Sequence, residues 1–213
     1  MKSLPDSVQR YLDKRAAGPP WTLAGNQEAE GLRGAIVIPS LAEGESLLAT
    51  LHSLAANPAE RLRRFLVIVV VNHRTDSAAA LRECNHQDLL NLADFALSSD
   101  LKLAWVDAAS AGRELPARGG VGMARKIGLD LALSRLDWSQ DPLLVCLDAD
   151  TLVEANYLAA IETHFTSAVA GAAALAFHHQ PAPDPAHQAA IDRYELFVRC
   201  YPLGLARAGS PYA

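Results

Sequence analysis

Hydrophobic and polar positions along this chain fall into two alternating patterns. Five short apolar runs have the character of strands: 35–38, 65–71, 102–106, 143–147 and 171–177. Four longer segments place apolar residues at helical spacing: 43–56, 76–97, 119–136 and 154–166. Strands that alternate with helices predict an α/β fold with a largely parallel sheet. The unbroken runs 65–71 and 143–147 are typical of buried strands.

The two ends of the chain carry further helical patterns. A helix is expected to begin at Ser3-Leu4-Pro5-Asp6 and to run to Ala17, because the tripeptide Gly18-Pro19-Pro20 would end it. Another is expected over residues 185–201. The expected organisation is an N-terminal helix and linker (1–33), a main domain (34–180) and a C-terminal helix (181–213).

Composition narrows the class of protein. The chain has 213 residues, of which half are hydrophobic and one fifth charged, so we expect a globular domain with a sizeable core. Its net charge of −5 gives no basic field to attract nucleic acid. No apolar stretch is long enough to span a bilayer, so we expect no transmembrane segment.

The cysteines indicate the compartment. The chain has three cysteines, Cys84, Cys146 and Cys200. Their odd number and the lack of a C-x-x-C pair argue against a disulfide framework or a zinc site. The chain also lacks an apolar signal region at its start. We therefore expect a cytoplasmic protein, with peripheral membrane association through a partner left open.

Two carboxylates, Asp148 and Asp150, flank Ala149 directly after the run 143–147. In open α/β sheets, ligands bind at the carboxyl ends of the strands. Two acidic groups at such a place repel each other unless a cation lies between them, and hard oxygen ligands suit Mg²⁺ or Mn²⁺. The pattern predicts a metal–diphosphate site, although a solvated loop would show the same residues.

Two other strand ends carry candidate ligand-binding residues. The loop that begins Pro39-Ser40-Leu41-Ala42-Glu43 offers backbone N–H groups at a helix start, which suit a base or a phosphate. After the next strand, Asn72 can bond a base or a ribose. Asp76 can either cap the following helix or contact a ligand.

A glycine-rich segment precedes the helix expected at 119–136. Gly119, Gly120 and Gly122 would let a ligand approach the backbone closely, and Arg125 and Lys126 could neutralise a diphosphate. The segment matches neither the dinucleotide fingerprint nor the G-x-x-x-x-G-K-[ST] phosphate loop. A dinucleotide oxidoreductase is therefore disfavoured.

Taken in order, these segments resemble the family 2 glycosyltransferases, which have the GT-A fold. The matching pieces are Ile36-Val37-Ile38-Pro39 with Glu43, Val69-Val70-Val71-Asn72 through Thr75-Asp76-Ser77, Gly122-Met123-Ala124-Arg125 with Gly128, and Leu147-Asp148-Ala149-Asp150. The resemblance covers residues 34–177. It implies a Rossmann-like three-layer α/β/α fold with a mostly parallel central sheet.

The resemblance also implies an activity. The family transfers a sugar from a nucleoside diphosphate, here a UDP- or GDP-linked donor, to an acceptor that would be a sugar, a lipid or a small molecule. The transfer is of the hexosyltransferase type and uses a divalent cation, Mn²⁺ or Mg²⁺. Asp150 would ligate this metal, and Asp148 would contact ribose or bind the metal through water.

The resemblance alone implies ligand-binding roles for other residues. The implied nucleotide-sugar-binding residues are Pro39, Ser40, Glu43, Asn72, Asp76, Gly122, Arg125 and Asp148. Asn72 stands where the family usually carries an Asp that contacts the base. Because Asn can donate as well as accept hydrogen bonds, this departure leaves the identity of the base open.

One element of the family pattern is missing, namely the acidic general base on the acceptor side. Asp184, Asp192 and Glu195 do not match its motif, and no catalytic residue is assigned. We expect the chain to be an incomplete and inactive fragment that stops near the start of an acceptor region. Inverting and retaining chemistry both stay open.

Two alternative functions remain beside glycosyl transfer. A nucleotidyltransferase would usually carry glycines just after its first strand, and the segment 39–43 lacks them. A non-catalytic nucleotide-sugar-binding module is favoured by the missing base. His178, His179 and His187 are expected to be surface residues rather than a metal cluster.

Overall fold

The computed structural model describes residues 4–26, 29–168 and 170–210. The chain divides into two compact units, residues 1–167 and 168–213. Helices and strands of the first unit are α1 (Asp6–Arg15), β1 (Ala24–Gly25), β2 (Gly34–Ser40), α2 (Glu45–Ala55), α3 (Ala59–Leu62), β3 (Phe65–Asn72), α4 (Ala79–Ser98), β4 (Leu103–Ala108), α5 (Val121–Ala132), β5 (Leu143–Cys146) and α6 (Tyr157–Ser167). The second unit contains α7 (Pro185–Arg207).

The sheet has the strand order β1-β4-β3-β2-β5. Strands β2, β3, β4 and β5 run parallel, and the two-residue β1 pairs antiparallel with β4. All residues of β2 and β3 are buried. Their continuous apolar sequences fit this central place, because both of their faces are covered by helices.

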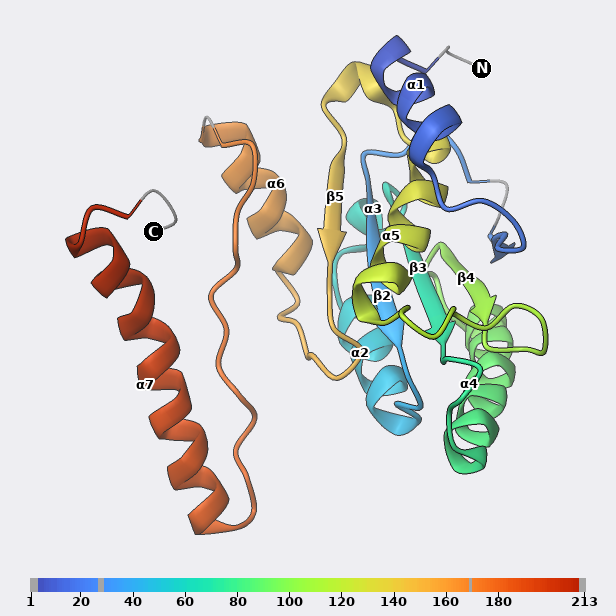
Figure 1. The fold of residues 1–213 in the computed structure, drawn as a ribbon. Coiled ribbons are helices and arrows are strands. Elements are labelled where there is room, and N and C mark those ends of the chain that lie inside the picture. Colours follow the sequence, from blue (N-terminus) through green and yellow to red (C-terminus); the bar gives the residue numbers. More distant parts are fainter. Residues whose placement is uncertain (1–3, 27–28, 169, 211–213) are drawn as a thin grey trace. The chain divides into compact units, whose positions relative to one another are not determined.

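Helices cover the two faces of the sheet in separate layers (Figure 1). Ile36 and Val67 belong to one core cluster, which includes residues of α2, α3, α4 and α6. Val37 and Ile68 belong to the other, under α5. The fold is therefore a three-layer α/β/α sandwich with a mostly parallel sheet, which confirms the predicted fold class.

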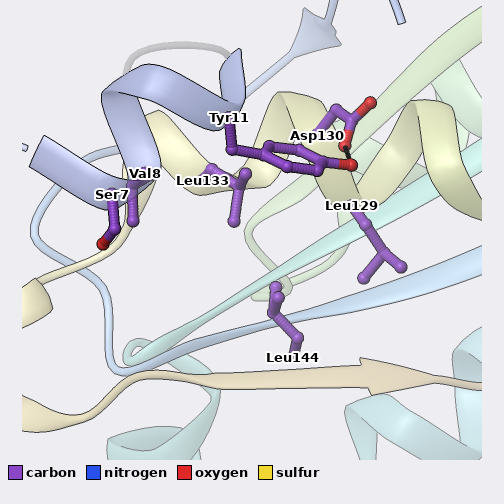
Figure 2. Close-up of a pocket in the computed structure, with 7 residues that line it drawn as sticks. All are labelled: Ser7, Val8, Tyr11, Leu129, Asp130, Leu133 and Leu144. Atoms are coloured by element: carbon purple, nitrogen blue, oxygen red, sulfur yellow. Dashed lines mark hydrogen bonds between the residues drawn. The ribbon is translucent and has the colours of Figure 1, made fainter. Parts of the chain in front are cut away.

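Helix α1 is fastened to α5 by a buried carboxylate. Asp130 is 5% exposed and accepts hydrogen bonds from the Tyr11 hydroxyl (2.9 Å), the Lys126 ammonium (2.5 Å) and the Ala17 backbone N–H (2.7 Å). Figure 2 shows the Tyr11 hydroxyl pointing at this carboxylate. Beside it lies a mostly apolar pocket of about 340 Å³, lined by Ser7, Val8, Tyr11, Leu129, Asp130, Leu133 and Leu144.

The prediction of a strand at residues 171–177 is wrong. These residues form no strand and are exposed, including Leu175 and Phe177. Gly171 and the three alanines that follow it offer little side-chain surface for packing against a neighbouring strand. Since strand preference depends on such packing, an apolar run of small residues is a weak signal.

Strand β5 is buried on one face only, which corrects the expectation of a fully buried strand. Leu143 and Val145 face the core, whereas Leu144 and Cys146 are exposed. Strand β5 is at the edge of the sheet and α5 packs mainly over β2 and β3, so among the described residues one face of β5 is only partly covered, with Leu144 lining a pocket beside α1 and α5.

Smaller differences concern the element ends. The expected linker contains β1, and α3 was not predicted. Helix α1 begins at Asp6, after Pro5, while Ser3 lies outside the described residues. Among the described residues, no helix is long and apolar enough to cross a membrane.

Candidate functional site

The sequence-predicted site residues come from one edge of the sheet. Strands β2, β3 and β5 run parallel, so the loops that follow them emerge at the same edge. Helix α5 follows the parallel strand β4, and its amino end therefore lies on that side as well (Figure 1). This edge is where open α/β sheets bind ligands.

The two carboxylates that follow β5 face solvent because the residue between them is anchored. Asp148 and Asp150 are exposed, whereas Ala149 is 3% exposed. The carbonyl of Ala149 accepts a hydrogen bond of 2.8 Å from the buried Thr50 hydroxyl of α2. Burial of the middle residue turns both flanking side chains outward.

Ser53 of α2 and Asn57, two residues after the end of that helix, hold the rest of this loop. The Ser53 hydroxyl accepts from the backbone N–H of Val153 at 3.1 Å, and the Asn57 side-chain carbonyl accepts from the N–H of Leu158 at 3.0 Å. Sequence reasoning missed this set. For Thr50 and Ser53, the signal was their place among the buried leucines of α2.

Arg125 of α5 forms an ion pair with Asp148. Both side chains remain accessible, with exposed fractions of 36% and 59%. The Arg125 Nε is buried without a hydrogen-bond partner among the described residues. The structure thus places a cation beside the first carboxylate of the pair, while Lys126, a residue expected to help neutralise a diphosphate, is bound to Asp130 instead.

Glu43 lies within electrostatic range of the same carboxylates. Burial raises the pKa of Glu43, and the negative charges of Asp150, Asp88 and Asp148 raise it further. This repulsion would be relieved by a bound cation. Glu43 therefore lies near several carboxylates at this edge of the sheet, one of which, Asp148, is paired with Arg125.

The donor set fits a cation that arrives together with phosphate. No three His, Cys, Asp or Glu side chains among the described residues are arranged to hold a metal ion by themselves. Mg²⁺ is commonly held by one or two carboxylates together with substrate phosphates and water. Asp150 and Asp148 are carboxylates of the kind that could hold such a cation, with the remaining ligands coming from phosphate and water.

Asn72 is engaged within the protein. It is 5% exposed, and its amide donates to the carbonyls of Ser40 at 2.8 Å and Val70 at 3.0 Å. An Asp at this position has no donor for either bond. The amide therefore joins the ends of β2 and β3, a link that an Asp at this position could not make.

Asp76 does not cap α4, so that alternative was wrong. The helix begins at Ala79 after the N-cap residue Ala78, without a side-chain cap. Asp76 is 62% exposed and pairs with Arg74 at 3.1 Å. A turn closed by the bond from the Arg74 N–H to the Ser77 hydroxyl delays the start of the helix.

The remaining predicted residues differ in how accessible they are. Pro39 and Ser40 are buried at the end of β2, and the Ser40 hydroxyl has no hydrogen-bond partner among the described residues. Gly122 lies in the first turn of α5, where an added Cβ would meet nothing within 4 Å. Its backbone is open to an approaching group.

Two buried polar residues of α4 were missed. Asn85 is fully buried and Asp88 is 1% exposed, and both bind the loop that follows β2. Their spacing of three residues places them on the buried face of α4 with Leu92 and Phe95. Polar residues on an otherwise apolar helix face were the available signal.

The histidines near residue 180 belong to the second unit. His178, His179 and His187 are exposed, as expected for surface residues, and His179 contacts Glu195 at 3.1 Å. Hydrogen bonds from the backbone N–H and the side chain of His179 lower the pKa of Glu195.

Two crystal structures of TarS 1–349 from S. aureus are similar to this chain. The first is 18% identical, with a TM-score of 0.41, and the match covers 62% of this chain and 32% of TarS. The second, in complex with UDP-GlcNAc, is 17% identical, with a TM-score of 0.38 and coverages of 62% and 30%. The matched part is thus about a third of either TarS chain. No protein-family model and no curated protein matches the chain.

Proposed function

We propose that this chain is the nucleotide-sugar-binding part of a metal-dependent glycosyltransferase of the hexosyltransferase type. One observation carries the proposal: Arg125 is paired with Asp148 at the carboxyl edge of a parallel sheet, beside the exposed Asp150. Cationic side chains and a divalent cation held by carboxylates both stabilise a bound diphosphate, and this edge offers Arg125 and the carboxylates that could hold such a cation.

Each residue has a defined part in the proposal. Asp150 holds Mn²⁺ or Mg²⁺ with the donor diphosphate, and Asp148 contacts ribose or binds the cation through water. When bound, the cation offsets the charge that develops on the leaving nucleoside diphosphate. Arg125 exchanges part of its contact with Asp148 for a phosphate oxygen.

The pocket for the nucleoside is proposed between the loops that follow β2 and β3. Pro39, Ser40 and Glu43 wall one side, and Asn72 and Asp76 the other. Gly122 leaves the first turn of α5 open, so that backbone N–H groups can approach the diphosphate. The donor would be UDP- or GDP-linked, and the acceptor belongs to the classes of sugars, lipids or small molecules.

Calorimetry with UDP, GDP and their common sugar conjugates, with and without Mn²⁺, tests the proposal. We expect binding of one nucleotide series that requires the metal, and weak binding of the metal alone because the protein supplies few ligands. Metal-independent binding, or no binding by the folded protein, would contradict the metal-dependent site.

Asp150→Asn tests the assignment of the metal ligand. The change removes one negative charge from the site, and we expect loss of the Mn²⁺-dependent part of binding. Asp94→Asn on the exposed surface of α4 removes the same charge elsewhere and should bind like the wild type. Equal affinity of both variants would remove Asp150 from the site.

The alternatives give different products. A nucleotidyltransferase would bind a nucleoside triphosphate and release pyrophosphate when given a sugar phosphate. A non-catalytic module would bind the nucleotide sugar without turnover. A glycosyltransferase would release nucleoside diphosphate and form a new glycosidic bond to an acceptor.

A further inference from the structure

Asn85, in the second turn of α4, connects the two loops proposed to wall the nucleotide. Its side chain is fully buried, although Asn is usually an exposed residue. The side-chain carbonyl accepts from the backbone N–H of Ala42, in the loop after β2, at 2.8 Å. The side-chain amide donates to the carbonyl of Asn72, the last residue of β3, at 3.0 Å.

The same amide contacts a buried histidine and fixes its protonation state. A backbone N–H is always a donor, so the Ala42 N–H must face the carbonyl oxygen of Asn85. The NH₂ group of Asn85 then faces His73, 2.9 Å from the Nδ1 of the imidazole. His73 Nδ1 must therefore accept, which leaves a neutral ring with its proton on Nε2.

The loop after β2 is held in a conformation that it would not keep unaided. Ala42 has φ of +57°, in the left-handed region that L-residues with a Cβ rarely adopt. Two side chains one turn apart on α4 bind this loop: Asn85 accepts from Ala42, and Asp88 accepts from the N–H of Gly44 at 3.4 Å. Such backbone strain persists only where surrounding contacts enforce it.

We infer that Asn85 is a positioning residue for the nucleotide site, which sets the loops after β2 and β3 relative to each other and does so only while His73 is neutral. The inference rests on the proposed function. Asn85 touches no ligand itself. It acts through Ala42, next to Glu43, and through Asn72.

Charged groups around His73 shift its pKa in opposite directions. Burial and the positive charge of Arg82 lower the pKa of His73, and the negative charges of Glu114 and Asp107 act in the opposite direction. His73 therefore stays neutral at about pH 7. Protonation in acid would turn Nδ1 into a donor that faces the Asn85 amide, and nucleotide binding should weaken in step.

Asn85→Asp is the direct test, because it keeps the shape and the acceptor for Ala42 but removes the NH₂ donor. We expect the affinity for the nucleotide that wild type binds with Mn²⁺ to fall at least about tenfold. The pKa of His73, followed by NMR of its imidazole, should rise because the new carboxylate favours the protonated ring. An unchanged pKa would mean that Asn85 does not contact His73, and a role limited to stability would leave nucleotide affinity independent of the protonation of His73.

Phe95→Leu provides a matched control on the same helix. Phe95 is buried in α4 two turns beyond Asp88, so its truncation should destabilise the fold while leaving both loops held. We expect the control to bind nucleotide like the wild type after correction for the unfolded fraction. Equal loss of affinity in both variants would overturn the positioning role.

If Asn85→Asp does not fold, measurements on the wild type test the positioning role of Asn85. Nitrogen NMR should show His73 with a bare Nδ1, and nucleotide affinity should fall with the protonation of that ring. An affinity that ignores His73 protonation overturns the inference alone. A wild type that binds none of the tested nucleotides overturns both the inference and the proposed function.

Discussion

The hydroxyl of Thr50 donates to the carbonyl of Ala149 across 2.8 Å, in the buried space between α2 and the end of β5. The bond ties the residue between two exposed carboxylates to a rigid helix. Asp148 and Asp150 consequently have their position set by α2 rather than by the loop itself. A change at Thr50 should therefore affect both stability and the site.

Thr50→Val tests this dependence, because it keeps the shape of the side chain and removes the donor. We expect a loss of about 1–3 kcal/mol in the free energy of unfolding, since the buried carbonyl of Ala149 loses its partner. Mn²⁺-dependent nucleotide affinity should also fall. Urea unfolding and calorimetry measure the two effects, and Thr50→Ser, which keeps the hydroxyl, should retain most of the affinity. An unchanged unfolding midpoint for Thr50→Val would contradict the role of the bond.

Arg125→Gln should separate binding from stability. Its ion pair with Asp148 is substantially exposed, and exposed pairs contribute about 0–1 kcal/mol. Loss of a charged donor to the diphosphate should lower nucleotide affinity about tenfold or more. Arg10→Gln on the exposed surface of α1 removes an equal charge away from the site and should have no such effect. Unchanged affinity of Arg125→Gln would mean that Arg125 serves only Asp148.

Glu43→Gln should make the protein more stable at neutral pH. Burial and the carboxylates of Asp150, Asp88 and Asp148 raise the pKa of Glu43, so its ionised form is unfavourable in the folded state. For a carboxyl whose pKa is raised on folding, this cost is present above the folded pKa and disappears below the ordinary one. We expect a gain of up to about 1 kcal/mol at neutral pH.

The pH dependence of that gain is the discriminating measurement. Urea unfolding should show it at neutral pH and lose it in acid, where Glu43 of the wild type is protonated as well. Glu83→Gln, on the exposed surface of α4, removes the same formal charge away from the cluster and should show no comparable change. A gain that persists in acid would attribute it to packing instead.

The core of the fold could be predicted from the sequence because its central strands are continuous runs of apolar residues. Every residue from Phe65 to Val71 is apolar, and such a run has few alternatives to a strand covered on both faces. The two-residue β1 carries no comparable pattern, since its pairing depends on β4. The run 171–177 shows the opposite failure, because apolar composition without packing partners did not produce a strand.

The site likewise contains residues that could be predicted from the sequence and residues that could not. Charged residues that directly follow an apolar strand, such as Asp148 and Asp150, are visible in the sequence and emerge at the expected edge. The groups that hold the loops of the site are not visible in the sequence. Thr50 binds Ala149, and Asn85 binds Ala42, which lie about one hundred and about forty positions away along the chain. Which buried backbone groups need a partner is known only once the helices are packed.

Replacement by alanine is expected to have opposite effects on stability at two glycines of α5. An added Cβ at Gly128 would lie 2.4 Å from Val37 Cγ1 and 3.0 Å from Val70 Cγ2, so Gly128→Ala must push α5 off the sheet, at a cost of about 1–3 kcal/mol. Gly122→Ala meets open space and should stabilise the helix by about 0.5–1 kcal/mol. If a diphosphate approaches this turn, the same Cβ will weaken Mn²⁺-dependent binding despite the greater stability. Thermal unfolding and calorimetry on both variants test this, and a Gly122→Ala protein that binds nucleotide as tightly as the wild type would place Gly122 outside the site.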